Sequence, residues 1–205
     1  MSKALPLSLG AAGAGGVGLG AAGLYHLNKG SQTPEVTFST KYDKALISFN
    51  SDDAIWTSKL SALETQSSTP KNQNLIKAKN EKKSGNEDTA KASLKAGCKE
   101  IYAKSVDDKE AFSDFKNFCS KHYSNLIGSS QLIASDSDLN NKWDTFKGKT
   151  DANLSGEFLK IHADKKSSQT EPQDWKQLVF AECQKLSSSI FEGEVKGYQE
   201  FCTKQ

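Results

Sequence analysis

The sequence contains no arginine, and all 27 of its basic residues are lysine. Without guanidinium groups the chain cannot form the bidentate arginine contacts that often bind carboxylates and phosphates. A genome poor in G and C accounts for this absence more simply than selected chemistry does. The 25 acidic residues leave a formal net charge of +2, which gives no sign of a nucleic-acid-binding surface.

Cysteine and proline are also scarce, with four of each among 205 residues, and the first cysteine is Cys98. A lipoprotein anchor, which requires a cysteine near the amino terminus, is therefore not expected. The hydrophobic share of 36% is modest but sufficient for a helical core, in one domain or two small ones.

Charged residues are absent between Lys3 and Lys29, in a stretch rich in leucine, alanine and glycine. The 24 residues from 4 to 27 would extend about 36 Å as a helix, enough to cross a hydrocarbon core of about 30 Å. We therefore expect residues 1–28 to form a transmembrane anchor and residues 29–37 to form a polar tether. The strongly apolar side chains of the expected membrane segment are Leu5, Leu7, Leu9, Val17, Leu19, Leu24 and Leu27.

A cleavable signal peptide is the alternative, because small residues around Gly20 fit a signal-peptidase site and Lys3 is a minimal positive region. Both interpretations place residues 30–205 outside the cell. Two Gly-x-Gly-x-x-Gly matches begin at Gly13 and Gly18, but the strand and the acidic residue that a dinucleotide site requires are missing. Such small residues are more typical of a helix-packing face in a membrane or of compositional bias.

Three sequence landmarks occur twice, in the same order and 83 to 87 residues apart. They are a tryptophan, an Ala-x-Cys motif and a Phe-Cys-Ser/Thr-Lys motif. This order predicts two copies of one module, at 38–130 and 131–205, with a serine-rich and glycine-rich boundary. The landmarks are Trp56 and Trp143, Cys98 and Cys183, and residues 118–121 and 201–204.

Apolar residues around each cysteine follow the spacing of an amphipathic helix. We expect each module to end in a helical hairpin whose two inward faces each carry one cysteine, with further helices over 41–49 and 54–63. The predicted fold class is all-α: an N-terminal membrane helix followed by a helical ectodomain built from two duplicated modules. The three tryptophans, Trp56, Trp143 and Trp175, are expected to be core anchors of their helices.

Local signals refine these expectations. Asp88 or Thr89 and, later, Thr170 are predicted N-caps. The lysine-rich stretch 69–88 is predicted to be an exposed arm or a frayed helix. It is interpreted as a solvated linker rather than a polyanion-binding surface, and it lacks the interleaved aromatic residues of a single-strand-binding protein.

The four cysteines lie outside the expected membrane segment, two in each module at matched positions. This arrangement predicts two disulfide bonds formed outside the cell. Four cysteines allow three connectivities, and the module symmetry favours Cys98–Cys119 and Cys183–Cys202. Each bond would close a loop of about 20 residues and contribute about 3 kcal/mol. Buried reduced thiols and other pairings remain the alternatives.

No residue is predicted to be catalytic, to bind a cofactor or to bind a metal. Cys119 and His122 offer two of the ligands that a zinc site needs, but the second copy has Gln205 in place of the histidine, so His122 is expected to be a solvated residue at a helix end. Neither His26 nor His162 has partners at metal-ligand spacing.

An aspartate-rich segment begins like a calcium loop, with Asp136, Asp138 and Asn140 at alternate positions. The glycine and the bidentate glutamate of such a loop are missing from their positions. Asp136 or Asp138 is therefore expected to be a helix cap ahead of Leu139 and Trp143.

The Met-Ser-Lys start before a Gly/Ala segment, the arginine-free domain of about 200 residues and the tryptophan and cysteine landmarks resemble the large paralogous families of uncharacterised membrane-anchored proteins in haemotropic mycoplasmas. The resemblance implies an exported protein on the surface of a wall-less parasite, with a part in antigenic variation or host contact. We expect a single-pass surface protein that contacts the lipid bilayer through its N-terminal segment and, through its ectodomain, host surface molecules but no nucleic acid. A secreted soluble domain is the alternative, and an extracytoplasmic enzyme is a remote one, because paired carboxylates, triads and metal clusters are not recognisable.

Overall fold

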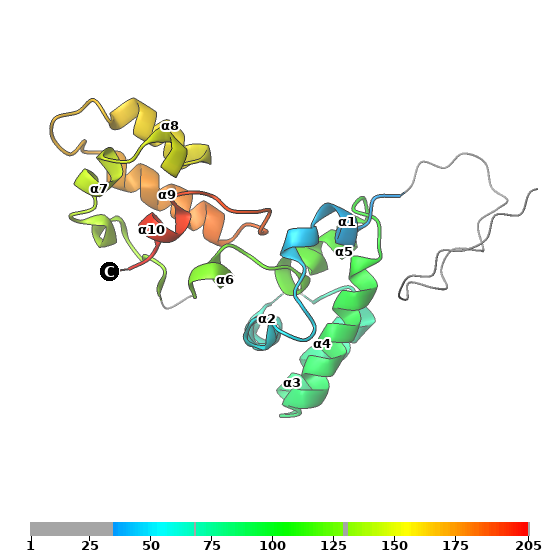
Figure 1. Cartoon of the computed structure of the whole chain (residues 1–205). Coiled ribbons are helices and arrows are strands. Elements are labelled where there is room, and N and C mark those ends of the chain that lie inside the picture. The colour runs from blue at the N-terminus through cyan, green and yellow to red at the C-terminus, as the bar shows by residue number, and fades with distance from the viewer. Residues whose placement is uncertain (1–34, 68, 129–130, 205) are drawn as a thin grey trace, which may run out of the picture. The chain divides into compact units, whose positions relative to one another are not determined.

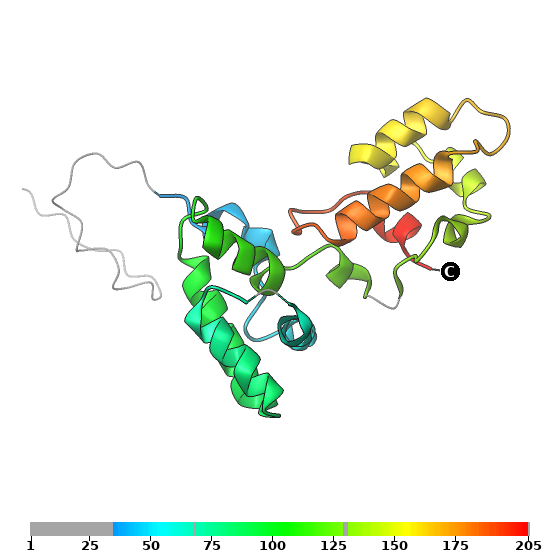
Figure 2. The same cartoon turned by 180° about the vertical axis from the view of Figure 1, so that it is seen from behind.

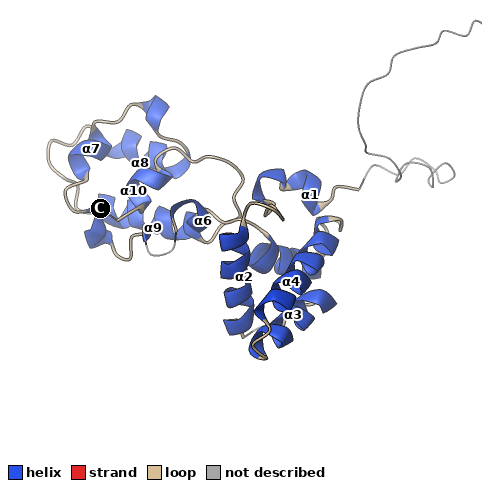
Figure 3. Cartoon of the chain, turned by 60° about the horizontal axis from the view of Figure 1, so that its bottom comes forward, coloured by secondary structure: helices blue, strands red, loops and turns tan. Residues whose placement is uncertain are grey.

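The computed structural model describes residues 35–67, 69–128 and 131–204. They form helices joined by irregular segments (Figure 3). Extended pairing within these ranges is confined to isolated bridges between single residues. The helical fold expected for this part of the chain is therefore confirmed. The expected membrane segment lies outside the described residues.

The helices follow one another in two runs, which we call the amino-terminal part (residues 35–121) and the carboxy-terminal part (residues 122–204); Figure 1 labels the α-helices. The first run is α1 (Phe38–Lys41), η1 (Asp43–Ala45), α2 (Asp53–Thr65), α3 (Gln73–Lys83), α4 (Glu87–Tyr102), α5 (Lys109–Asp114) and the π-helical turn η2 (Phe115–Cys119). The second run is α6 (Ser124–Ile127), η4 (Asp136–Leu139), α7 (Trp143–Lys147), η5 (Asp151–Asn153), α8 (Gly156–Lys165), α9 (Trp175–Ser187) and α10 (Tyr198–Cys202).

Helix α4 forms because its apolar residues recur at helical spacing and its first turn carries two acidic residues, Glu87 and Asp88, which interact favourably with the helix dipole. It begins at Glu87 after the N-cap Asn86, two or three residues before the N-cap expected at Asp88 or Thr89. Helix α9 begins later than expected: its N-cap is Asp174 and its first residue is Trp175, whereas the sequence predicted an N-cap at Thr170. The buried face of α4 carries Ala90, Leu94, Cys98 and Ile101. On α9 the corresponding buried residues are Trp175, Val179 and Cys183.

The lysine-rich stretch 69–88, expected to be an exposed arm or a frayed helix, contains the regular helix α3, which is packed against its neighbours, so its exposure was wrongly predicted. Helix α3 runs along α4 and buries Leu75 and Ala78 (Figures 1 and 2). Gly97 of α4 permits this close approach, because a Cβ atom there would lie 2.8 Å from Asn72 Oδ1 and 2.9 Å from Leu75 Cδ2. Gly85, with φ +80°, allows the sharp turn between the two helices.

Two further expectations need correction. The expected helix at 41–49 is reduced to the short α1 and η1, whereas the helix expected at 54–63 is confirmed as α2. The second helix of the carboxy-terminal hairpin is only α10, because residues 192–197 are not helical. Gly193 and Gly197 adopt φ values of +133° and +97°, which other residues rarely adopt, and this backbone delays the start of α10.

Buried side chains form two hydrophobic clusters. The first gathers around Trp56, Phe38 and Phe115 and the second around Trp143, Trp175 and Phe201. The three tryptophans are at most 5% exposed, so their predicted role as core anchors is confirmed. Ile190 of the carboxy-terminal part belongs to the first cluster, so one side chain of the second run of helices packs into the core of the first.

Candidate functional site

Two disulfide bonds link the helices that carry the cysteines. Cys98 of α4 pairs with Cys119 at the end of η2, with their Cα atoms 5.2 Å apart, and Cys183 of α9 pairs with Cys202 of α10, with Cα atoms 5.4 Å apart. All four side chains are buried and none is a free thiol. The expectation of two disulfides, in this pairing, is confirmed.

Antiparallel bridges join distant segments in the same way in both parts of the chain. Thr37 pairs with Ser105. His122 and Ile190, which each lie 85 residues after Thr37 and Ser105 respectively, pair in the same way. The flanking amides and carbonyls bond in one pattern. The hydrogen bonds are Val106 N to Val36 O and Phe38 N to Lys104 O in the first bridge, and Phe191 N to Lys121 O and Tyr123 N to Ser189 O in the second.

A second kind of bridge follows each disulfide. Ser120, which comes after Cys119, pairs with Leu46, and Thr203, which comes after Cys202, pairs with Leu132. The lysine of each Phe-Cys-Ser/Thr-Lys motif then donates its backbone amide at 2.7 Å, from Lys121 to Ala45 O and from Lys204 to Gln131 O. The motif therefore carries a disulfide, a bridge and a backbone hydrogen bond in consecutive residues.

Two aspartates, Asp52 and Asp138, accept a hydrogen bond from the backbone amide four residues earlier, at 2.7 Å and 2.6 Å. Burial alone would raise the pKa of Asp52, but hydrogen bonds from Lys121 and the Ser48 amide outweigh it and hold the pKa below its usual value. Backbone hydrogen bonds lower the pKa of Asp138. The N-cap of η4 is Ser135, and not Asp136 or Asp138 as the sequence predicted; Asp138, at the third helical position, completes the capping box.

Two lysines that the sequence patterns did not single out are almost completely buried. Lys59 is 5% exposed, its Nζ lies 3.4 Å from Asn117 O, and burial lowers its pKa to about 8. Lys142 is 4% exposed and donates to Glu200 O at 3.3 Å and Thr203 O at 2.7 Å. Burial lowers the pKa of Lys142 as well. Both ammonium groups cap carbonyls near the second cysteine of a disulfide.

The histidines do not form a catalytic or metal-binding group within the described residues, which contain no cluster of three potential metal ligands. His122 is not the solvated helix-end residue that was expected: it is half-buried, and its Nε2 lies 2.6 Å from Lys116 O. Burial, together with the nearby Lys59 ammonium, lowers the pKa of His122 to about 4. His162 is buried, with its Nε2 3.2 Å from Lys147 O.

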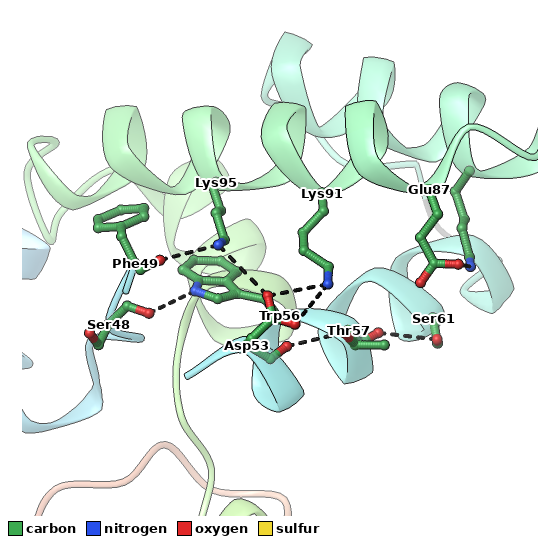
Figure 4. Close-up of polar contacts among 10 residues, drawn as sticks. Ser48, Phe49, Asp53, Trp56, Thr57, Ser61, Glu87, Lys91 and Lys95 are labelled. Carbon is green, nitrogen blue, oxygen red and sulfur yellow. Dashed lines mark hydrogen bonds and ion pairs between the residues drawn. The ribbon is translucent and has the colours of Figure 1, made fainter. Parts of the chain in front are cut away.

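Lys91 and Lys95 of α4 are turned toward α2 (Figure 4). Lys91 Nζ lies 3.0 Å from Asp53 Oδ2, and Lys95 Nζ lies 3.9 Å from Asp53 Oδ1 and 5.8 Å from the centre of the Trp56 ring. The indole nitrogen of Trp56 donates to Ser48 O at 2.8 Å. These charges connect two helices of the same part, although exposed ion pairs contribute at most about 1 kcal/mol each.

A cavity of about 380 Å³ lies beside the start of α10. Its apolar wall consists of Leu126, Phe191, Val195 and Tyr198, and its polar lining includes Glu194. The Tyr198 hydroxyl is buried and has no hydrogen-bond partner in the described structure. Two glycines within five residues, at 193 and 197, are the sequence signal that could have indicated an irregular segment here.

Within the described ranges no helix is both long enough and apolar enough to cross a membrane. The seven residues of the expected membrane segment, from Leu5 to Leu27, lie outside those ranges. Comparisons with protein-family models, with curated proteins and with solved structures found no match.

Proposed function

We propose that the chain is an exported surface protein whose disulfide-linked helical domain acts by binding. The observation that carries this proposal is the pair of buried disulfides. Disulfide bonds form and persist mainly in oxidising compartments outside the cytosol. A protein with all four of its cysteines in such bonds is suited to the outside of a cell.

In this proposal residues 1–28 hold the domain at the membrane as a single-pass anchor. The tether expected at 29–37 ends before Val36, because Val36 and Thr37 pair with Val106 and Ser105 in the folded part. The support for the anchor is the uncharged segment of 25 residues between Lys3 and Lys29. Cleavage of the same segment as a signal peptide, with release of a soluble domain, is the second candidate. It is favoured by the glycine content of the segment, which weakens a membrane helix.

We also propose that the domain is an internal duplication. Both kinds of bridge recur 83 to 86 residues apart, and so do the disulfides, the aspartates and the Phe-Cys-Ser/Thr-Lys motifs. The two Phe-Cys-Ser/Thr-Lys lysines also end their copies with the same backbone bond. This spacing favours a boundary near Lys121, about ten residues before the boundary at 130 expected from the sequence.

The proposed role is that of a variable antigen or a host-contact domain, with host surface molecules as partners and no enzymatic activity. The resemblance to surface protein families supports this role, and the near-neutral charge of the chain gives no reason to propose a nucleic-acid partner. A comparison of paralogous sequences would test the antigen role. In a variable antigen, exposed positions should vary more than the buried tryptophans and cysteines.

Protease shaving of intact cells tests the location. Peptides from residues 40–205 should be released from intact cells, and a cytosolic marker protein should be released only after permeabilisation. Release of the same peptides into the medium without protease would favour the secreted form. Protection of residues 40–205 in intact cells would refute surface exposure.

A further inference from the structure

Two side chains that can carry positive charge contact adjacent carbonyls at the end of the π-helical turn η2. The His122 Nε2 lies 2.6 Å from Lys116 O, and the Lys59 Nζ lies 3.4 Å from Asn117 O. A ring nitrogen this close to a carbonyl oxygen carries a hydrogen, so a second proton would bind at Nδ1. Within the described residues Nδ1 has no hydrogen-bond acceptor.

The charged groups that act on this imidazole are positive. They are the ammonium groups of Lys59, from α2, and Lys116, from η2. From α6 the uncharged Asn125 accepts a hydrogen bond from the His122 backbone amide at 2.7 Å. The segment that pairs with His122, residues 189–191, is Ser-Ile-Phe and carries no charge.

The carboxylates of the neighbouring segments act on other groups. The Asp52 Oδ2 lies 2.7 Å from the Lys121 Nζ, and Glu192 acts on the Tyr123 hydroxyl. In the described structure a positive charge on the His122 ring would therefore lack a carboxylate to neutralise it.

His122 lies where the two parts of the chain are joined. Its backbone pairs with Ile190, whose side chain packs into the first hydrophobic cluster. On either side of this pair, Tyr123 N donates to Ser189 O at 3.3 Å and Phe191 N donates to Lys121 O at 2.9 Å. We call this pairing of residues 121–123 with residues 189–191 the junction.

The corresponding bridge of the amino-terminal part has a threonine in place of the histidine. Thr37, 85 residues before His122, pairs with Ser105. The flanking bonds, Phe38 N to Lys104 O and Val106 N to Val36 O, are both 3.0 Å long. The chain therefore contains the same backbone pairing with and without an imidazole.

We propose that the junction is an acid-sensitive hinge. Protonation of His122 places a third positive charge beside Lys59 and Lys116 and releases the ring from η2, and the pairing of residues 121–123 with residues 189–191 then opens. The closed junction disfavours the added charge through burial and through the two ammonium groups, whereas a ring in water accepts it freely.

The direction of the pH dependence follows from proton binding. The pKa of His122 is about 4 in the closed junction, against about 6.5 for an exposed histidine, so the open form binds more protons between these pH values. The closed junction therefore loses stability as the pH falls from 6.5 to 4 and is unaffected above this range. The opening equilibrium should increase about 30-fold between pH 7.5 and pH 5.

Residue-resolved hydrogen exchange of the full-length, disulfide-intact protein in detergent tests this proposal at pH 7.5 and pH 5. After correction for intrinsic exchange rates, protection of the Tyr123 and Phe191 amides should fall about 30-fold at the lower pH. Protection of the Phe38 and Val106 amides, in the bridge without histidine, should change less than about threefold. Unchanged protection at the junction, or an equal fall at both bridges, would overturn the proposal.

The substitution His122→Gln tests the source of the dependence. A glutamine amide can still donate to Lys116 O but does not titrate, and Gln205 is the corresponding residue after the second Phe-Cys motif. Protection at the junction at pH 7.5 should stay within about threefold of the wild type, and the fall at pH 5 should disappear. Retained protection of the Phe38 and Val106 amides shows that the variant folds. A fall as large as that of the wild type would assign the dependence to another group.

The matched control is His162→Gln, because the His162 ring also lies against a backbone carbonyl, with its Nε2 3.2 Å from Lys147 O. This variant should keep the fall of about 30-fold at the junction. Loss of the dependence in both variants would contradict the role of His122. Titration of the His122 ring by NMR is an independent measurement in the wild type, and a midpoint near 6.5 instead of 4 would also overturn the proposal.

Discussion

The hydroxyl groups of Tyr102 and Tyr198 are in opposite hydrogen-bonding situations, although both rings are buried. Tyr102 Oη donates to Cys119 O at 2.7 Å and accepts from Ile47 N at 3.2 Å, so it joins the segment after η1 to the disulfide. Burial raises the pKa of Tyr102 above its usual value. The Tyr198 hydroxyl has no partner in the described structure, and burial raises its pKa to about 12.

These two tyrosines provide a matched pair of substitutions. Tyr102→Phe should lower the free energy of unfolding by about 1–3 kcal/mol, because it leaves the Ile47 amide and the Cys119 carbonyl buried without a partner. Tyr198→Phe should leave that free energy within about 0.5 kcal/mol of the wild type or raise it. Urea unfolding of the disulfide-intact protein measures both. Equal losses in the two variants would contradict the hydrogen-bond assignments.

Lys59 should make stability depend on alkaline pH. Burial lowers its pKa to about 8 in the folded protein, against 10.5 for an exposed lysine, so the unfolded chain binds more protons between these pH values. Stability should therefore rise between pH 8 and pH 10.5, by up to about 3 kcal/mol.

The substitution Lys59→Met should remove this rise, whereas Lys77→Met, at an exposed residue of α3, should preserve it. Urea unfolding midpoints at pH 7.5, 8.5 and 9.5 measure the dependence. A flat profile in the wild type, or the same slope in both variants, would show that Lys59 is not buried in its charged form.

Helix α3 depends on a glycine of its neighbour. Gly97→Ala should improve the intrinsic helix propensity of α4 by about 1 kcal/mol but push α3 away from α4, for a net loss of about 1–2 kcal/mol. Lys99→Ala on the exposed side of α4 is the control, with an expected change below about 0.5 kcal/mol. Hydrogen exchange should be faster in α3 than in α9 after the glycine substitution. Unchanged protection of α3 would contradict the close packing.

The two disulfides should differ in how much local structure depends on them. Removing either pair by double substitution to alanine should cost about 2–5 kcal/mol. Helix α10 has only five residues and cannot persist alone, whereas α5 and η2 together have eleven. Loss of Cys183–Cys202 should therefore abolish exchange protection in α10, while loss of Cys98–Cys119 should leave partial protection in α5. The reverse order would contradict this explanation.

Sequence patterns predicted the elements whose apolar stripes are strong and failed where backbone conformation or tertiary contact decides. The stripes around Cys98 and Cys183 indicated α4, α9 and the disulfide pairing. The packing of helix α3 was missed because its composition is polar and its two buried residues gain their environment from α4 and α2. The shortness of α10 and the neighbouring cavity depend on positive φ values at Gly193 and Gly197, which no periodicity shows.

At the scale of the whole molecule, the charges divide between the expected anchor and the domain. Lys3 and Lys29 flank the uncharged segment, so residues 30–205 contain the other 25 lysines and all 25 acidic residues. Many of these charges form exposed pairs, such as Lys91 with Asp53 and Lys176 with Glu171. The domain is thus held together mainly by its two buried clusters and two disulfides.

The central claim is that both cysteine pairs are oxidised because the domain is outside the cell. Non-reducing peptide mass spectrometry of protein taken from intact cells, with thiols blocked at lysis, tests it most directly. The account predicts one linked peptide pair containing Cys98 and Cys119 and another containing Cys183 and Cys202, with no blocked thiol at any of the four. Blocked free thiols at all four cysteines would contradict the account.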